Sequence, residues 1–143
     1  CSSDLEGDGG NSKVQDLKRR CEMVRKIQPD CVLSIHQNSY PEEAIHGAQV
    51  FYYEDSSEGK KLAEILQKHL VEVLDKENHR QAKGNRTYYM LKKTEATLVI
   101  VECGFLSNNQ EALLLTDEKY QNKVAKAICS GTLEYLSSLA EKK

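Results

Sequence analysis

The sequence predicts an α/β fold in which a mostly parallel sheet is flanked by helices. Amphipathic helical segments alternate with short apolar runs along the chain, an order of elements that is typical of this class. Two of the runs, residues 31–36 and 97–102, are apolar on both alternate sets of positions, as expected of strands that are covered on both faces. The 143 residues, of which 39% are hydrophobic, fit one globular domain.

The first helix is expected over residues 13–28. Ser12-Lys13-Val14-Gln15 has the form of a capping box, and apolar residues then recur at helical spacing until Pro29. Residues 1–11 are expected to form an acidic loop that precedes this helix.

Two strands are expected next. Residues 31–36 (CVLSIH) are too few for a helix, and residues 47–53 (GAQVFYY) are rich in β-branched and aromatic side chains. The loop between them is too short to hold a parallel crossover helix. The two strands therefore either run antiparallel or lie in different parts of the sheet.

A second helix begins near Ser57 and has the strongest helical signal in the chain. Its apolar stripe follows the spacing of one helix face: Leu62, Ile65, Leu66, His69, Leu70, Val73 and Leu74. The polar and basic segment 77–86 is expected to be a surface loop that leads to a short apolar run at 88–91.

A third long strand is expected at residues 97–102 (TLVIVE), in the centre of the sheet, because both of its faces are apolar. Helices at about 108–115 and about 117–136 complete the chain. The core of the single domain is expected to span residues 12–137, and a short tail follows at 138–143.

The charge balance excludes recognition by a global electrostatic field. Twenty basic residues against 22 acidic ones leave a formal net charge of -2, which favours neither nucleic acid nor an anionic membrane surface. The apolar runs are far shorter than a membrane span. The five cysteines contain no Cys-x-x-Cys pair and are interpreted as mostly buried, reduced thiols: Cys1, Cys21, Cys31, Cys103 and Cys129.

His36 and Glu102 are the first candidates for chemistry, because each stands at the C-terminal end of an expected buried strand. In open α/β sheets, ligands bind beyond the carboxyl ends of the strands. A neutral imidazole is a good zinc ligand, and a nearby free carboxylate can move a proton from an attacking water to a leaving amine. Position alone also fits structural roles, namely a hydrogen-bonded histidine and a glutamate that caps the following turn.

Five segments carry a resemblance to a known family: LSIHQNS, GAQVFYY, LAEILQKHL, TLVIVECGFLSNNQEALLL and KYQNKVAKAICSGTLEYL. Together they resemble the zinc-dependent N-acetylmuramoyl-L-alanine amidases that cut bacterial peptidoglycan. The stretches HQNS, GAQVFYY and ENHRQAKGN are most similar to the spore-cortex or germination type of these amidases. The resemblance implies a three-layer fold like that of the zinc amidases and aminopeptidases.

The resemblance also implies a role for each matching residue. Glu102 would act as general base and then general acid, and His36 would be a ligand of a catalytic Zn²⁺. Asn38, Phe105 and Asn108 would shape the cleft that binds the substrate. That substrate is peptidoglycan, and the bond that is cut is the amide between the lactyl group of muramic acid and L-alanine.

A local basic cluster surrounds the expected loop after the second helix: Arg80, Lys83, Arg86, Lys92 and Lys93. We predict that Arg80 and Lys83 bind carboxylates of the peptide stem, and the alternative is a solvated loop. A nucleic-acid site in this segment is disfavoured because the segment is short and the chain is slightly acidic.

Two motifs of the family are not found in the chain. One is a Gly-His-Gly-Gly-like strand end that supplies a zinc ligand, and the other is a glutamate that supplies a second ligand. Because catalytic zinc normally has three protein ligands, His36 alone would not hold it tightly. His46, His69 and His79 are predicted to be structural or solvent-exposed.

We therefore expect that an N-terminal strand-helix-strand unit is missing and that the chain as given is inactive. Such a loss predicts an exposed sheet edge and self-association through it. The main hypothesis is a peptidoglycan amidase, and the alternative is a catalytically inactive peptidoglycan-binding or regulatory module. The resemblance implies an extracytoplasmic location, at the cell wall or spore cortex, although the N-terminal residues do not have the form of a signal peptide.

Overall fold

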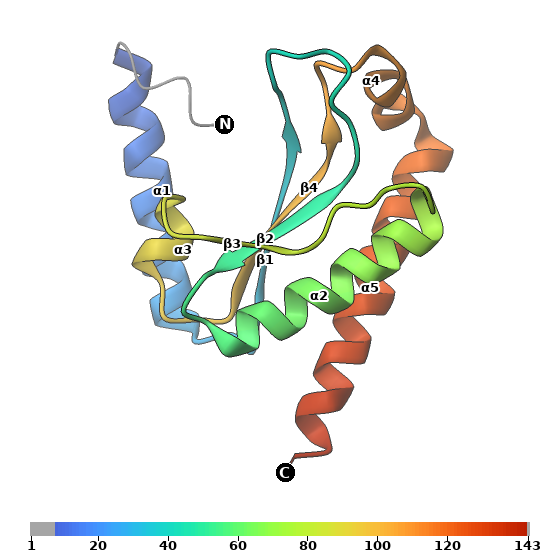
Figure 1. Ribbon diagram of the computed structural model, residues 1–143. Helices are drawn as coiled ribbons and strands as arrows, with labels where there is room; N and C mark the ends of the chain where they lie inside the picture. Colours follow the sequence, from blue (N-terminus) through green and yellow to red (C-terminus); the bar gives the residue numbers. More distant parts are fainter. Residues whose placement is uncertain (1–7, 143) are drawn as a thin grey trace.

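The computed structural model describes residues 8–142, in which helices pack on both faces of a four-stranded sheet (Figure 1). Helices α1 and α3 lie on one side of the sheet, and α2 and α5 lie on the other. The predicted α/β class is confirmed. The elements in chain order are α1 (Asp8–Ile27), β1 (Val32–Asn38), β2 (Gln49–Tyr53), α2 (Ser57–Leu74), β3 (Lys83–Asn85), α3 (Tyr89–Lys93), β4 (Leu98–Phe105), α4 (Asn109–Thr116) and α5 (Glu118–Ala140).

The strands of the sheet are arranged in the order β1-β4-β2-β3. The β1–β4 and β2–β3 pairs are parallel, and the β2–β4 pair is antiparallel. The sheet is therefore mostly parallel, as predicted. Both alternatives for the first two strands hold: β1 and β2 run in opposite directions, since β4 is parallel to β1 and antiparallel to β2, and they are not neighbours because β4 lies between them.

Strand β4 is buried along its whole length, which confirms its predicted central place. Val99 and Val101 belong to the core formed with α2 and α5. Leu98 and Ile100 belong to the core formed with α1 and α3. Because side chains alternate along a strand, Glu102 continues the second set and projects to the α1/α3 face.

Strand β1 differs from its prediction, because it was expected to be covered on both faces. Among residues 8–142 it pairs with β4 alone, so it forms an edge of the sheet. Ile35 is 56% exposed, so the prediction of cover on both faces is wrong at this position. An apolar pattern indicates which side chains favour burial, but it does not show which neighbours are present to bury them.

The predicted apolar stripe of α2 is confirmed except at Val73, which is 46% exposed. Ser56 caps α2, accepting a hydrogen bond at 2.9 Å from the Gly59 amide. Leu62, Leu66 and Leu70 of α2 pack in one core with the apolar face of α5, which consists of Val124, Ala127, Ile128 and Tyr135. Helix α5 continues to Ala140, beyond the end predicted for it, and so takes in part of the expected tail.

Helix α1 begins earlier than its predicted capping box. Residues 1–7 of the expected acidic loop lie outside the described residues, and from Asp8 onward the chain is helical. Ser12 and Gln15 therefore lie inside the helix. A capping preference contributes only about 1 kcal/mol and does not end a helix that continues upstream.

Two further predictions need correction. The segment 77–86 was expected to be entirely loop, but Lys83–Asn85 pairs with β2 as the short edge strand β3. Cys129 was interpreted as one of the mostly buried thiols, but it is exposed, whereas Cys21 and Cys103 are buried. Because successive residues turn by about 100° around a helix, Cys129 stands well away from the buried face formed by Val124, Ile128 and Tyr135. Within residues 8–142, none of the helices has the length and apolar character that crossing a membrane requires.

Candidate active site

The site begins with a row of three paired residues across the sheet. His36 of β1 pairs with Glu102 of β4, and Glu102 also pairs with Gln49 of β2. Paired residues on adjacent strands project to the same face, so these three side chains share the α1/α3 face of the sheet. The row lies near the carboxyl ends of β1 and β4, where ligands bind in sheets of this kind.

Glu102 is the most unusual group in this row. Its side chain is only 2% exposed, and its Oε2 atom has no hydrogen-bond partner among the described residues. Burial raises the pKa of this carboxyl group above its ordinary value. A buried carboxylate without a partner is costly for folding, and such groups are found where function uses them.

His36 stands beside it with one ring nitrogen already in contact with a neighbour. Its Nε2 atom lies 2.7 Å from the hydroxyl oxygen of Ser34, which is on the same face of β1. Burial, followed by the nearby positive charge of Arg20, lowers the pKa of this imidazole. The neutral form that results has a lone pair available to a metal or a proton donor.

Tyr88 contributes a phenol ring to the α3 side of the row. Its ring contacts Phe51 edge to face, with the ring centroids 5.5 Å apart. Burial raises the pKa of Tyr88, and the negative charge of Glu102 raises it further. Sequence reasoning did not select Tyr88, because its position depends on the path of the chain between β3 and β4.

Arg80 reaches the row from the segment that follows α2. Its Nε donates to the His46 carbonyl at 2.8 Å, and its Nη1 donates to Gln49 Oε1 at 3.2 Å. The guanidinium carbon lies 5.0 Å from the centre of the Phe105 ring, a cation-π contact. The structure therefore brings the two predicted substrate-binding residues Arg80 and Phe105 together, next to Gln49.

Gln49 is a member of this row that sequence reasoning missed. Its amide donates to the Gln81 carbonyl at 2.9 Å while its oxygen accepts from Arg80, so it connects the loop after α2 to the sheet. Gln49 can be assigned to this row only from the register of β2 against β4, and no local pattern in the sequence specifies that register.

The other predicted substrate-binding residues lie in different settings. Asn38 Oδ1 accepts from the amide of Ser39 at 2.8 Å, within the turn that follows β1. Asn108 caps α4 by accepting from the Glu111 amide at 2.9 Å, and it donates to the Glu43 carbonyl at 2.9 Å. Lys83 is exposed on the edge strand β3, and β2 separates it from β4. These three residues are not gathered around Glu102 as Arg80 and Phe105 are.

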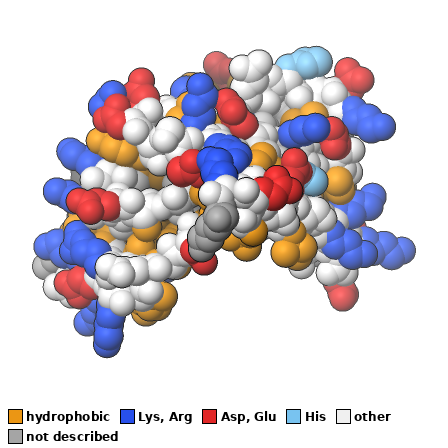
Figure 2. All heavy atoms as spheres, turned by 90° about the horizontal axis from the view of Figure 1, so that it is seen from below, with side chains coloured by type: hydrophobic (Ala, Val, Ile, Leu, Met, Phe, Trp, Pro, Cys, Tyr) orange, Lys and Arg blue, Asp and Glu red, His pale blue; other side chains and the backbone are white. Residues whose placement is uncertain are grey.

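Arg86, another residue of the basic cluster, is neutralised by two carboxylates. Arg86 pairs with Glu54 and Asp55, its Nε lying 2.7 Å from one carboxylate and its Nη2 lying 2.8 Å from the other. On the face shown in Figure 2, Lys and Arg side chains are interspersed with Asp and Glu, and apolar side chains lie between them. That face has no large field of one sign.

The remaining histidines are placed as predicted. His46 and His79 are exposed, and His69 of α2 is half-buried with its Nε2 2.5 Å from Glu134 of α5. None of them joins His36 in a metal site, because residues 8–142 contain no group of three or more His, Cys, Asp or Glu side chains that could hold a metal ion. Burial also raises the pKa of the Cys103 thiol to about 11, so the free thiol is protonated at neutral pH.

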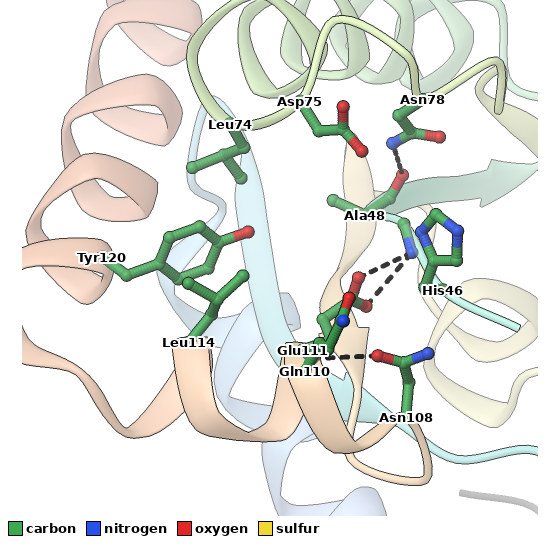
Figure 3. A pocket seen from close by; sticks show the side chains of 11 residues that line it. His46, Ala48, Leu74, Asp75, Asn78, Asn108, Gln110, Glu111, Leu114 and Tyr120 are labelled. Carbon is green, nitrogen blue, oxygen red and sulfur yellow. Dashed lines mark hydrogen bonds between the residues drawn. The ribbon is translucent and has the colours of Figure 1, made fainter. Parts of the chain in front are cut away.

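A pocket of about 210 Å³ lies apart from this row (Figure 3). Its lining includes His46, Asp75, Asn78, Glu111 and Tyr120, which come from the segment before β2, the end of α2, and helices α4 and α5. Neither His36 nor Glu102 lines it. The pocket therefore does not mark the candidate site, although Glu111 links the two regions.

Comparison with known proteins agrees with this geometry. Residues 5–134 match the family model described as N-acetylmuramoyl-L-alanine amidase. The chain is 37% identical over 134 residues to the germination-specific N-acetylmuramoyl-L-alanine amidase of Bacillus subtilis (strain 168), a match that covers 92% of this chain and 56% of that protein. It is also 30% identical over 130 residues to the amidase LytC of the same organism, with coverage of 87% and 25%.

Solved structures show the same likeness. The CwlD amidase from Clostridioides difficile, determined in complex with the GerS lipoprotein, superposes with a TM-score of 0.88 and 37% identity, covering 96% of this chain and 70% of that one. The catalytic domain of the amidase CwlV from Bacillus (Paenibacillus) polymyxa var. colistinus superposes with a TM-score of 0.77 and 30% identity, covering 85% and 65%.

The fold and the matches together define an amidase-type α/β domain. The chain belongs to the N-acetylmuramoyl-L-alanine amidase family. The family predicted from the sequence motifs is thus confirmed, including the likeness to the germination type. The chain spans 56% of the length of the Bacillus subtilis relative and 70% of the Clostridioides difficile chain.

Proposed function

We propose that this chain forms the greater part of a peptidoglycan amidase domain, which hydrolyses the amide between the lactyl group of muramic acid and L-alanine. The observation that carries the proposal is the Glu102 carboxylate, which is 2% exposed, has an unpartnered oxygen and lies beside His36 at the end of the sheet. A carboxyl group with a raised pKa in such a place is suited to accept and return a proton.

In the proposed reaction, Glu102 takes a proton from the water that attacks the lactyl carbonyl carbon. The same carboxyl group then gives that proton to the nitrogen of L-alanine as the C–N bond breaks. The products are a free lactyl carboxylate and a peptide with a free amino terminus. One side chain can perform both steps because the carboxyl group regains its starting state at the end.

Zinc is proposed as the cofactor of the complete site, but the described residues do not fit it by themselves. A catalytic zinc normally has three protein ligands, whereas His36 stands as a lone candidate ligand within residues 8–142. We propose that His36 is one ligand of a site completed by groups outside these residues.

We propose that Arg80, supported by Phe105 and Gln49, binds a carboxylate of the peptide stem. Its Nε and Nη1 atoms are held by hydrogen bonds, so the guanidinium is oriented before a substrate arrives. Lys83 is proposed to act at longer range from β3. Asn38 and Asn108 are proposed to shape the loops at the ends of β1 and β4.

The names of the relatives support a place of action. One relative is named germination-specific and others are named cell wall amidases. We propose that this protein acts outside the cytoplasm, at the cell wall or spore cortex. The side of β1 away from β4 is proposed as a surface for self-association, because β1 pairs with β4 alone among residues 8–142 and Ile35 on it is 56% exposed.

The experiment that tests the proposed reaction measures cleavage of a muramoyl-peptide by the full-length protein. Glu102→Gln should abolish turnover while zinc content is retained, and His36→Ala should lower both. His79→Ala is the matched control, because His79 is an exposed histidine outside the row. Full turnover by Glu102→Gln would contradict the proposed role of the carboxylate.

A second candidate function is favoured by one observation, namely that residues 8–142 contain no cluster of three possible metal ligands. This is a catalytically inactive module that binds peptidoglycan or regulates another enzyme. It predicts that the full-length protein binds peptidoglycan without cleaving it, with or without added zinc. Cleavage that depends on Glu102 would eliminate this alternative.

A further inference from the structure

The pairing of β1 with β4 is irregular directly after the candidate catalytic residue. His36 pairs with Glu102, but the next recorded pair is Asn38 with Phe105. Strand β4 therefore has an extra residue relative to β1 in the interval that holds Cys103 and Gly104. Such a bulge bends the strand and redirects its side chains, and bulges of this kind are common next to active sites.

Glu111 of α4 is the side chain that holds this bulge. Its Oε1 accepts a hydrogen bond from the Phe105 amide at 2.5 Å and another from the Gly47 amide at 3.1 Å. Its Oε2 accepts from the same Gly47 amide at 2.8 Å. Glu111 is only 8% exposed, so both oxygens are committed to backbone donors in a buried setting.

These two amides flank the row that contains Glu102. Phe105 follows the bulge in β4, and Gly47 shortly precedes Gln49, the residue of β2 that pairs with Glu102. Figure 3 shows the Glu111 carboxylate directed toward the chain between His46 and Ala48, with dashed lines marking its hydrogen bonds. A single carboxylate thus joins the end of β4 to the segment that enters β2.

Gly104 allows this carboxylate to lie so close to the strand. A Cβ atom at position 104 would stand 2.5 Å from Glu111 Oε1, which is closer than non-bonded contacts allow. At position 47 the backbone φ is +104°, a conformation that L side chains rarely adopt, so glycine is required there for a different reason. Both glycines therefore serve the same contact with Glu111.

Asn108 fixes the direction from which Glu111 approaches. It caps α4 through the Glu111 amide, which places the first turn of the helix against the end of β4. The spacing Asn108-x-x-Glu111 has the form of a capping box, but the Glu111 carboxylate bonds to Gly47 and Phe105 instead. The Glu111 side chain therefore does not complete the capping box of α4.

We infer that Glu111 is a positioning residue for the amidase reaction, holding the β4 bulge so that Glu102 faces the bond to be cut. This inference rests on the proposed function. Glu111 touches neither His36 nor Glu102 and acts through the backbone of β4 and of the segment before β2. Misplacement of a catalytic group by about 1 Å can lower a rate about 100-fold, so a remote clamp of this kind affects turnover.

The test compares Glu111→Gln with Glu118→Gln in the full-length protein. Both glutamates lie in the first turn of a helix, but Glu118 is exposed. Glutamine keeps the shape of Glu111 but turns an NH2 donor toward a backbone amide. We expect faster hydrogen exchange at the Phe105 and Gly47 amides, and a kcat lower by about 10-fold to 100-fold with KM changed less than about 2-fold. The control should change none of these quantities.

A second variant reaches the same contact without removing the carboxylate. Gly104→Ala should push Glu111 away and produce the same loss of kcat, which keeps the inference testable if Glu111→Gln folds poorly. Faster amide exchange in a folded variant with wild-type kcat would overturn the inference, because Glu111 would then be purely structural.

A failure of the proposed function can be recognised separately. If the wild-type protein cleaves no muramoyl-peptide, that function fails, and the carbon-13 resonance of the Glu102 carboxyl group decides the positioning role instead. A shift of this resonance in Glu111→Gln, absent in Glu118→Gln, supports the positioning role. An unchanged resonance contradicts it.

Discussion

His36 and Glu102 are paired residues on adjacent parallel strands, and their side chains project to the same face of the sheet. They are far apart in sequence, so only the pairing of β1 with β4 brings them together. One is an imidazole whose pKa is lowered by burial, and the other is a carboxyl group whose pKa is raised by burial. Burial therefore favours the neutral form of each, as suits a pair that exchanges protons or binds a metal.

Glu102→Gln should stabilise the metal-free protein while abolishing turnover. The wild-type carboxylate is buried and one oxygen has no partner, whereas an amide of the same shape carries no charge into the interior. We expect the free energy of unfolding at neutral pH to rise by about 1–3 kcal/mol. Denaturant unfolding of the two proteins in the presence of chelator measures this change. A variant that is less stable than wild type would contradict the prediction, because it would mean that the carboxylate forms stabilising interactions that glutamine cannot form.

Arg80→Met should weaken substrate binding more than it slows the reaction. The change removes the cation-π contact with Phe105 and the hydrogen bond to Gln49. We expect KM for a muramoyl-peptide to rise about 10-fold, the loss of one charge-assisted contact, with little change in kcat. Arg86→Met is the control, because Arg86 already pairs with Glu54 and Asp55. Equal KM values for both variants would remove Arg80 from the proposed binding site.

Tyr135→Phe should flatten the dependence of stability on acid pH. The Tyr135 hydroxyl donates to Glu58 Oε2 at 2.9 Å, and this hydrogen bond is the main reason that the pKa of Glu58 is lowered. Because the folded pKa lies below the unfolded one, the stabilisation is present above the unfolded pKa and is lost as pH falls through the folded value. The variant should lose less than about 1 kcal/mol, since the carboxylate is largely solvated.

The measurement is a series of denaturant unfolding curves from neutral pH into the acid range. Tyr135→Phe and wild type should differ most at neutral pH and converge in acid. A difference that stays constant with pH would mean that the hydroxyl matters for packing and not for the ionisation of Glu58.

Ile35→Lys should reduce self-association of the described domain. Ile35 is 56% exposed on β1, the strand whose other edge is unpaired among residues 8–142, and an inserted lysine on an edge strand opposes edge-to-edge pairing. Light scattering at increasing protein concentration should show less association than for wild type. Val73→Lys is the control, since Val73 is 46% exposed on α2. Equal association of all three proteins would place the contact elsewhere.

The sequence was sufficient to predict the α/β class, the buried central strand that ends in Glu102, and the long helices. Each of these features depends on the spacing of apolar residues along a short segment, which can be recognised in a single sequence. The motif around Glu102 was also specific enough to predict the family that the comparisons confirm.

Other features depend on contacts between distant segments and could not be predicted. The strand order puts β4 between β1 and β2, and it alone places Gln49 next to Glu102. Strand β3, with 3 residues, is too short to show an alternation of apolar and polar side chains. The exposure of Ile35 depends on which segments pack against β1, and the sequence of β1 does not specify them. The hydrogen bonds that the Glu111 carboxylate accepts from the Gly47 and Phe105 amides were not predicted, because Gly47 is far from Glu111 in the sequence.

The role of Glu102 as proton carrier in amide hydrolysis is tested most directly by cleaving a muramoyl-peptide in water enriched in oxygen-18 with the full-length protein and with Glu102→Gln. We expect that wild type places the heavy oxygen in the lactyl carboxylate, that the released peptide begins with an unlabelled L-alanine amine, and that Glu102→Gln forms neither product. Label in any other position, or equal labelling by the variant, would contradict the assignment of this site as an amidase that uses Glu102.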